Sequence, residues 1–264
     1  MSQIELKNVT KAYYADRKKS LARVVLDNIC LEIEEGEFVT LIGPSGCGKT
    51  TVLNLIAGFE APTLGTVEVN GKEVKSPSPE RGVIFQEYSL LPWMDVKSNI
   101  ELALECQNVP VHERAGKISK ALGIVRMSEF ADSRPNILSG GMKQRVAIAR
   151  LIAMDSEIFL MDEPFSALDE QTRKKLDEDI VEIWKNSGKT AVMVTHSIEE
   201  ALTVSTRIIM FSDSPGRIIG EWRLPEEMNR DPYSEEFVKL KIEIMEWLPA
   251  CPCTRKERRW IAIE

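Results

Sequence analysis

The chain has 264 residues, with 34 Lys and Arg against 41 Asp and Glu, and a formal net charge of −7. This length suits one large α/β domain or two small ones, and the acidic balance gives no global basic field that would favour nucleic acid. No apolar run reaches the roughly 18–20 residues of a membrane span, the N-terminal residues show no signal-peptide pattern, and an odd number of cysteines suits a reduced compartment, so we expect a soluble cytoplasmic protein.

Residues 3–42 predict a β-rich start. Ile4, Leu6 and Val9 begin one strand, and a second alternates apolar and polar residues from Ile29 onward. Tyr13 lies between them. Its ring could stack on a purine, or it could belong to the core of the first sheet, and these residues alone leave both open.

Residues 43–51 read GPSGCGKTT and satisfy the phosphate-loop pattern G-x-x-x-x-G-K-[ST]. Glycines let backbone N–H groups point at phosphate oxygens, and the following helix adds its N-terminal dipole. Lys49 supplies an ammonium for the β- and γ-phosphates, and the Thr50 hydroxyl is a hard oxygen ligand for Mg²⁺.

The context supports this interpretation over an ordinary Gly-rich turn. Residues 38–42 predict a buried strand that enters the loop, and residues 51–57 a helix that leaves it and ends at Gly58. We therefore predict a nucleoside triphosphate site. We also expect the thiol of Cys47 to ionise readily, because it lies beside Lys49 and a helix N-terminus.

The middle of the chain changes character. Residues 65–71 predict a strand that ends in an Asn-Gly turn, and residues 82–85 a buried strand that leads to Gln86. Residues 88–93 are unusually apolar for a loop and end at Trp93, which either docks a partner or packs the helices that follow. From about Val96 to Ala131 the composition predicts several short helices.

Residues 138–145 read LSGGMKQR and open another predicted helix, with Ser139 as its N-cap. Two adjacent glycines at a helix start leave backbone N–H groups open to an anion. Glycines also simply make turns, so this pattern gains its weight from the phosphate loop upstream and the acidic residues downstream.

Residues 158–163 predict a buried strand that ends in two carboxylates, Asp162 and Glu163. Ligands of open α/β sheets bind at such strand ends, so Asp162 would hold the Mg²⁺ shell and Glu163 would polarise the attacking water. Taken alone, a strand-terminal acid pair also fits the start of a loop.

Residues 190–195 predict another buried strand, which delivers His196 to the same sheet edge as Asp162. A histidine there could donate to the γ-phosphate, although a lone histidine at a strand end is usually structural. Residues 207–211 and 217–220 predict the final strands, and Ser234 to Trp247 an amphipathic helix. The basic tail after it is expected to be a solvated segment, with contact to an anionic membrane surface as the alternative.

In this order the motifs resemble those of the nucleotide-binding subunits of ABC transporters, over nearly the whole chain. Residues 43–51 resemble Walker A, Gln86 the Q-loop, residues 138–144 the signature, residues 158–163 Walker B, residues 166–169 the D-loop and His196 the switch histidine. The resemblance implies an α/β P-loop NTPase of ABC type: a RecA-like core with an antiparallel β-subdomain and a helical signature subdomain. Residues 1–232 would form the nucleotide-binding domain, with the helical subdomain at about 96–150, and residues 233–264 the C-terminal helix and basic tail.

The family also implies roles for individual residues. Mg-ATP would be sandwiched between two such subunits, a second copy or a homologous subunit, so that Ser139 and Gly141 act across the interface. Residues 9–13 resemble the adenine-stacking segment, which favours Tyr13 as a base contact. The residues expected to contact ATP are Tyr13, Gly43, Pro44, Ser45, Gly46, Cys47, Gly48, Lys49, Thr50, Thr51, Gln86, Ser139, Gly140, Gly141, Gln144 and Asp169. The expected Mg²⁺ ligands are Thr50, Gln86 and Asp162, and the catalytic residues Glu163, His196, Gln86 and Lys49.

Residues 81–93 and 214–218 look like those of nitrate, sulfonate and taurine import ATPases. This similarity implies a peripheral motor subunit at the cytoplasmic face of the inner membrane. Its partners would be an integral permease and, through it, a periplasmic or extracellular binding protein, with no nucleic acid. The alternative is the ATPase subunit of another ABC system, with a different import substrate or an exporter. DNA-repair and translation-factor ATPases fit less well, because the sequence has neither a long coiled-coil insertion nor a second nucleotide domain.

Overall fold

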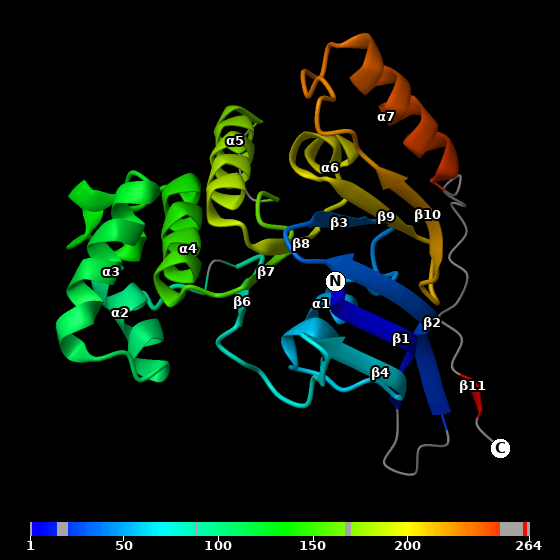
Figure 1. Cartoon of the computed structure of the whole chain (residues 1–264), viewed down its shortest axis with the longest axis horizontal. Coiled ribbons are helices and arrows are strands. Elements are labelled where there is room, and N and C mark those ends of the chain that lie inside the picture. Colours follow the sequence, from blue (N-terminus) through cyan, green and yellow to red (C-terminus); the bar gives the residue numbers. More distant parts are fainter. Residues whose placement is uncertain (1, 15–20, 88, 167–169, 249–260, 263–264) are drawn as a thin grey trace. The chain divides into compact units, whose positions relative to one another are not determined.

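The computed structural model (Figure 1) describes residues 2–14, 21–87, 89–166, 170–248 and 261–262. The chain divides into two compact units. The first combines both ends of the sequence, residues 1–77 and 194–264, and the second is the continuous segment 78–193. No helix among the described residues is both long and apolar enough to cross a membrane.

The first unit contains a five-stranded sheet of order β11-β2-β1-β4-β5. Its strands pair antiparallel, and β1 lies between β2 and β4. Apolar residues of β1 such as Ile4, Leu6 and Val9 are buried, as the sequence predicts. Asn70 and Gly71, both with positive φ, make the predicted turn between β4 and β5. The strands are β1 (Ser2–Tyr14), β2 (Leu21–Glu34), β4 (Leu64–Val69), β5 (Lys72–Glu73) and β11 (Ile261–Ala262).

A second group of strands in this unit, in the order β10-β9-β3, positions the phosphate loop. β3 runs parallel to β9, β10 runs antiparallel to β9, and every residue of β3 and β9 is buried. Continuous burial explains why both read as short apolar runs in the sequence. The elements are β3 (Phe38–Ile42), β9 (Arg207–Phe211), β10 (Ile218–Arg223), α1 (Lys49–Ala57), α6 (Ile198–Val204) and α7 (Glu235–Trp247).

Helix α7 belongs to the same core as these strands. Its residues Phe237 and Ile244 are fully buried in a cluster with Leu202 of α6 and Met210 of β9. Ser234 caps the helix by accepting a hydrogen bond from the Phe237 N–H. The predicted amphipathic helix of residues 234–247 is therefore confirmed.

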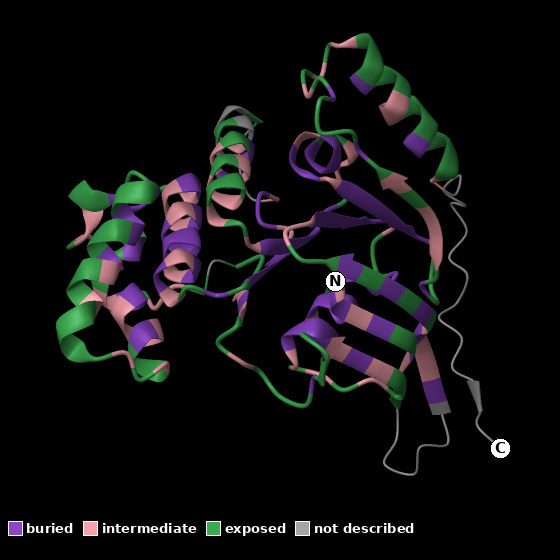
Figure 2. Cartoon of the chain, viewed as in Figure 1, coloured by how far each residue is buried: buried purple, intermediate pink, exposed green. Residues whose placement is uncertain are grey.

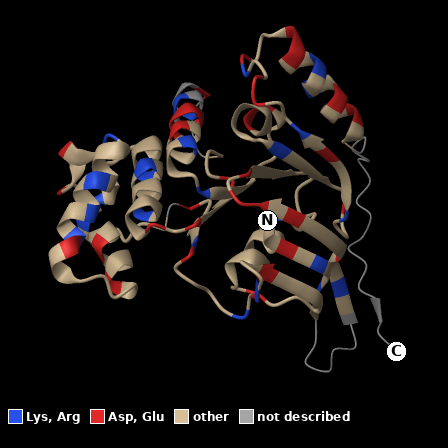
Figure 3. Cartoon of the chain, viewed as in Figure 1, with Lys and Arg blue, Asp and Glu red and all other residues tan. Residues whose placement is uncertain are grey.

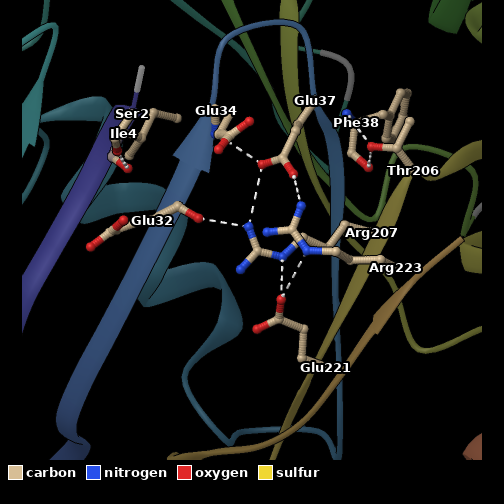
Figure 4. A network of polar contacts seen from close by, with 10 residues as sticks. All are labelled: Ser2, Ile4, Glu32, Glu34, Glu37, Phe38, Thr206, Arg207, Glu221 and Arg223. Atoms are coloured by element: carbon tan, nitrogen blue, oxygen red, sulfur yellow. Dashed lines mark hydrogen bonds and ion pairs between the residues drawn. The ribbon is translucent and has the colours of Figure 1, made fainter.

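A buried arginine ties β9 to its neighbours (Figure 4). The Arg207 guanidinium donates to the Glu32 carbonyl at 2.7 Å and forms ion pairs with Glu37 and Glu221. Arg223 pairs with the same Glu37 carboxylate. These contacts link β2 and β10 to β9. They also pair the buried guanidinium, whose charge would be destabilising without a partner.

The second unit consists of three strands in the order β8-β7-β6 and a set of helices. β6 and β7 are parallel. Helix α4 packs against α2, α3, α5 and β6, and Figure 2 shows buried residues along α4. The elements are β6 (Arg81–Ile84), α2 (Val96–Cys106), α3 (Val111–Ile124), α4 (Gly140–Met154), β7 (Ile158–Asp162), α5 (Glu170–Ser187) and β8 (Thr190–Val194), with short 3₁₀ turns at Ser128–Phe130 and Pro135–Ile137.

Candidate nucleotide site

The phosphate loop joins β3 to α1 in the first unit. Gly43, Gly46 and Gly48 all have positive φ, which lets the backbone curl around the side chain of Lys49. That side chain is 6% exposed, and its ammonium donates to the carbonyls of Gly43 and Pro44 at 2.8 and 2.9 Å. The loop thus holds its lysine at its centre, as the phosphate-binding prediction requires.

Two glycines allow the loop to pack closely. A Cβ at Gly48 would lie 2.6 Å from Leu26 Cδ2, and a Cβ at Gly216 would lie 2.1 Å from the carbonyl oxygen of Cys47. Gly216 also joins the β2 backbone, because its N–H donates to the Val25 carbonyl at 2.8 Å. Sequence reasoning noted residues 214–218 as part of a family resemblance and missed this support of the phosphate loop. The one local signal for it was the glycine at position 216.

The environment of Cys47 contradicts the expected reactivity. The side chain is fully buried, and burial raises the pKa of the thiol above its usual value. The charge and hydrogen bonds of Lys49, whose Nζ lies 3.8 Å from Sγ, oppose this shift but do not outweigh it. The prediction of a readily ionised thiol is therefore wrong, because desolvation dominates over the nearby cation.

The other loop residues differ in exposure. Ser45, Gly46 and Thr50 are exposed, whereas Thr51 is buried. The expected Mg²⁺ ligand of the loop, Thr50, is thus the more accessible of the two threonines.

Tyr13 lies at the end of β1 beside the loop helix. Its side chain is 39% exposed, which makes it an edge residue and not part of the core of the sheet. Its hydroxyl donates to Glu60 Oε2 at 2.6 Å and also has a hydrogen bond with the Thr51 side chain. The Lys11 ammonium lies 5.1 Å from the centre of the ring. The structure thus brings Tyr13 together with the phosphate-loop helix.

Glu60, just after α1, is the centre of this group. It accepts hydrogen bonds from Tyr13 and Asn54 and forms an ion pair with Lys11 at 3.0 Å. Burial alone would raise the pKa of its carboxyl, but these contacts outweigh burial and hold that pKa below its usual value. Sequence reasoning missed Glu60, because a single acid after a helix has no distinctive pattern.

His196 follows β8, belongs to the first unit and is exposed. The Thr195 N–H donates to the Leu41 carbonyl of β3 at 3.2 Å. Residue 196 therefore lies near the C-terminal end of β3, where the phosphate loop begins at residue 43. The Thr195 hydroxyl donates to Glu200, and Ser197 caps α6. These contacts fix the backbone on both sides of the histidine.

In the second unit, Asp162 and Glu163 end β7 as predicted. Both side chains are partly exposed, and Glu163 has a φ of 44°. The N–H and hydroxyl of Ser166 both donate to the Glu163 carbonyl, at 3.2 and 3.1 Å. These two hydrogen bonds stabilise the sharp turn after β7, in which the backbone of Glu163 has a left-handed conformation.

The glycine-rich helix start lies in the same unit. Ser139 is exposed and caps α4, accepting a hydrogen bond from the Met142 N–H at 3.3 Å, which confirms the predicted cap. Gly140 is partly exposed and Gly141 buried. Gln144 is 0% exposed, and in the described part of the chain neither of its amide atoms has a hydrogen-bond partner. Any contact of Gln144 with a nucleotide would thus require its side chain to move.

Gln86 follows β6 and is exposed, and Trp93 is exposed over 68% of its surface. The alternative that Trp93 packs the helices is therefore wrong. Leu90 and Leu91 are partly buried. The predicted contact Asp169 and the loop residue Tyr88 lie outside the described residues.

The comparisons with known proteins agree with this geometry. The family model described as "ABC transporter" matches residues 26–166. The taurine import ATP-binding protein TauB of Jannaschia is 40% identical over 255 residues, which cover 93% of each chain. The bicarbonate transport ATP-binding protein CmpD of Synechococcus elongatus is 42% identical over 218 residues, covering 82% of this chain and 77% of the relative.

A solved structure gives the same result for the fold. The dimeric post-hydrolysis state of the ATP-binding cassette MJ0796, bound to ADP and Pi, superposes with a TM-score of 0.72 at 34% identity. The match covers 84% of this chain and 99% of that one. The mixed α/β cassette fold expected from the motifs is therefore confirmed.

Proposed function

The chain belongs to the ABC transporter family as an ATP-binding, ATP-hydrolysing subunit, and from this premise we propose that it drives an importer of small anions. The substrate class would include taurine, other sulfonates, nitrate and bicarbonate. Support for it comes from the relatives that import taurine and bicarbonate. The chain would work at the cytoplasmic face of the membrane, bound to permease subunits that also receive an external binding protein.

The proposal rests mainly on the buried Lys49, which lies inside a loop whose glycines have positive φ. An ammonium held there can bind phosphate oxygens together with the N–H groups at the start of α1. The exposed Thr50 hydroxyl and the carboxylate of Asp162 are the hard oxygen donors that Mg²⁺ prefers, with Gln86 as a further amide ligand. Each of these donors has the chemistry that Mg-ATP requires, and the ion would neutralise phosphate charge.

The remaining residues have separate roles. Glu163 would orient and polarise the attacking water, and His196 would donate to the γ-phosphate. Tyr13 would stack on the adenine, with its hydroxyl held by Glu60. Ser139 and the glycines after it would bind the nucleotide of a second subunit, because an exposed capped helix start can receive an anion.

Glu163→Gln tests the hydrolytic role. The variant should bind ATP as well as wild type, lose turnover by at least about 10²-fold, and run as a dimer on gel filtration with Mg-ATP. Glu129→Gln, at an exposed site, is the matched control and should hydrolyse ATP normally. A Glu163→Gln protein that stays monomeric and turns over normally would exclude this role.

The import proposal has its own test. Vesicles that contain the permease and this subunit should take up labelled taurine, nitrate or bicarbonate when binding protein is added outside and ATP inside. Uptake that is absent for every small anion, with ATPase activity intact, would refute the substrate class but not the ATPase assignment.

A further inference from the structure

The second unit contains an open cavity of about 540 Å³ among α3, α4, α5 and the start of β7. This volume lies within the range of small-molecule sites. Phe159 lines the cavity near the start of β7, whereas Asp162 and Glu163 lie at the other end of that strand, about 10 Å further on at 3.3 Å per residue. Residues at the C-terminal end of α4, from Leu151 onward, also line the cavity. Along the helix axis they lie about 18 Å from Ser139, which caps the other end of α4.

Part of the lining is apolar. Ile124, the last residue of α3, is 43% exposed, and the largely buried Phe159 and Leu151 also line the cavity. An exposed isoleucine beside a hollow of this size gives an organic molecule an apolar surface to cover.

The charged lining has an excess of cations. Lys189 is paired with Asp155 at 2.9 Å, and Asp179 with Arg145. Within the described ranges, Lys117, Lys120 and Arg126 have no ion pair or hydrogen-bonded acid. Glu182 is the one lining acid of the described part that is likewise unpaired. Figure 3 shows the basic residues of α3 as blue segments of that helix.

We propose that this cavity binds a small organic anion. Its carboxylate or sulfonate group would contact Lys117, Lys120 and Arg126, and its apolar body would cover Ile124 and Phe159. Lysines one turn apart on α3 can share one anionic group, because residues i and i+3 lie on the same helix face. Such a ligand would touch the ends of α4 and β7 that lie away from the signature and the acid pair.

The probe for the test is 1-anilinonaphthalene-8-sulfonate, an aromatic sulfonate whose fluorescence rises in apolar surroundings. Wild-type protein should bind it saturably, and Lys117→Glu/Lys120→Glu should weaken binding at least tenfold. The matched control, Lys72→Glu/Lys239→Glu, makes the same charge change at exposed lysines elsewhere and should bind within twofold of wild type. Octanesulfonate should displace the probe, whereas methanesulfonate and octyltrimethylammonium should not.

The substitutions replace two lysines of α3 by acids, so the melting temperature of each variant is measured as well. If the double variant does not fold, Lys120→Gln should still weaken binding at least threefold. Equal affinity in the cavity variants and the control would overturn the proposal. Displacement by octyltrimethylammonium as easily as by octanesulfonate would also overturn it, and so would competition by ATP without Mg²⁺, which would locate the probe in the nucleotide site.

Discussion

Cys47 shows how burial decides the chemistry of a residue that its neighbours in sequence seem to activate. The thiol lies beside Lys49 and a helix start, yet it has no solvent exposure, and burial raises its pKa. The neutral thiol is a poor nucleophile. The sequence shows that Lys49 is close to Cys47, but it does not show that the thiol is buried. The protonation of the thiol could therefore not be predicted from the motif.

We therefore predict that Cys47 resists alkylation in the folded protein. With N-ethylmaleimide at neutral pH, the exposed Cys30 and Cys106 should be modified first, and Cys47 at least tenfold more slowly. Peptide mass spectrometry after timed quenching measures each site. Protein unfolded in urea is the control, in which the three thiols should react alike. Modification of Cys47 as fast as of Cys30 would contradict the burial argument.

Glu60 gives a pH-dependent prediction. Its carboxyl pKa is lower in the folded protein than the ordinary value of 4.5, so the carboxylate contributes stability above that pH and loses it as pH falls through the folded pKa. Glu60→Gln should be less stable than wild type at pH 7, by about 1 kcal/mol or less because the side chain is partly exposed. The difference should shrink below pH 4.5.

Urea unfolding of both proteins between pH 7 and pH 3.5 measures this difference. Glu129→Gln serves again as the control and should show no such pH dependence. A stability gap that stays constant or widens toward acid would mean that the contacts of Glu60 with Tyr13 and Lys11 do not act through its charge.

At the scale of elements, the phosphate loop depends on a turn from the other end of the chain. Gly216 lies against the Cys47 carbonyl, and any side chain there must displace backbone. Gly216→Ala should keep the fold but weaken ATP binding at least tenfold, measured by titration calorimetry. Gly123→Ala, on α3 with open space around it, is the matched control and should bind ATP like wild type. Normal affinity in Gly216→Ala would show that the loop tolerates the shift.

Most elements could be predicted because their patterns are local. Continuous apolar runs gave β3 and β9, a serine cap gave the start of α4, and an Asn-Gly pair gave the turn after β4. The contact of Gly216 with Cys47 and that of Glu60 with Tyr13 join residues far apart in sequence, and no local pattern encodes them. The burial of Gln144 was missed for the same reason, since burial depends on tertiary packing and not on the local sequence.

At the scale of the whole molecule, the exposed Trp93 is the best candidate for contact with the permease. A large aromatic side chain in water is typical of an interface anchor. Trp93→Ala should leave the melting temperature and ATP affinity unchanged and reduce co-purification with the permease at least tenfold. Trp247→Ala, also exposed but on α7, should assemble normally. A Trp93→Ala protein that assembles like wild type would exclude docking through this residue.

The division of the chain into an interrupted unit and a continuous one has a consequence for synthesis on the ribosome. Strand β3 emerges early, but its partner β9 and the supporting Gly216 follow only after residues 78–193. At ordinary elongation rates this delay is on the order of ten seconds. During that time the apolar β3 lacks its parallel neighbour β9. The nucleotide loop therefore reaches its final form only after residues 78–193, β9 and Gly216 have been synthesised.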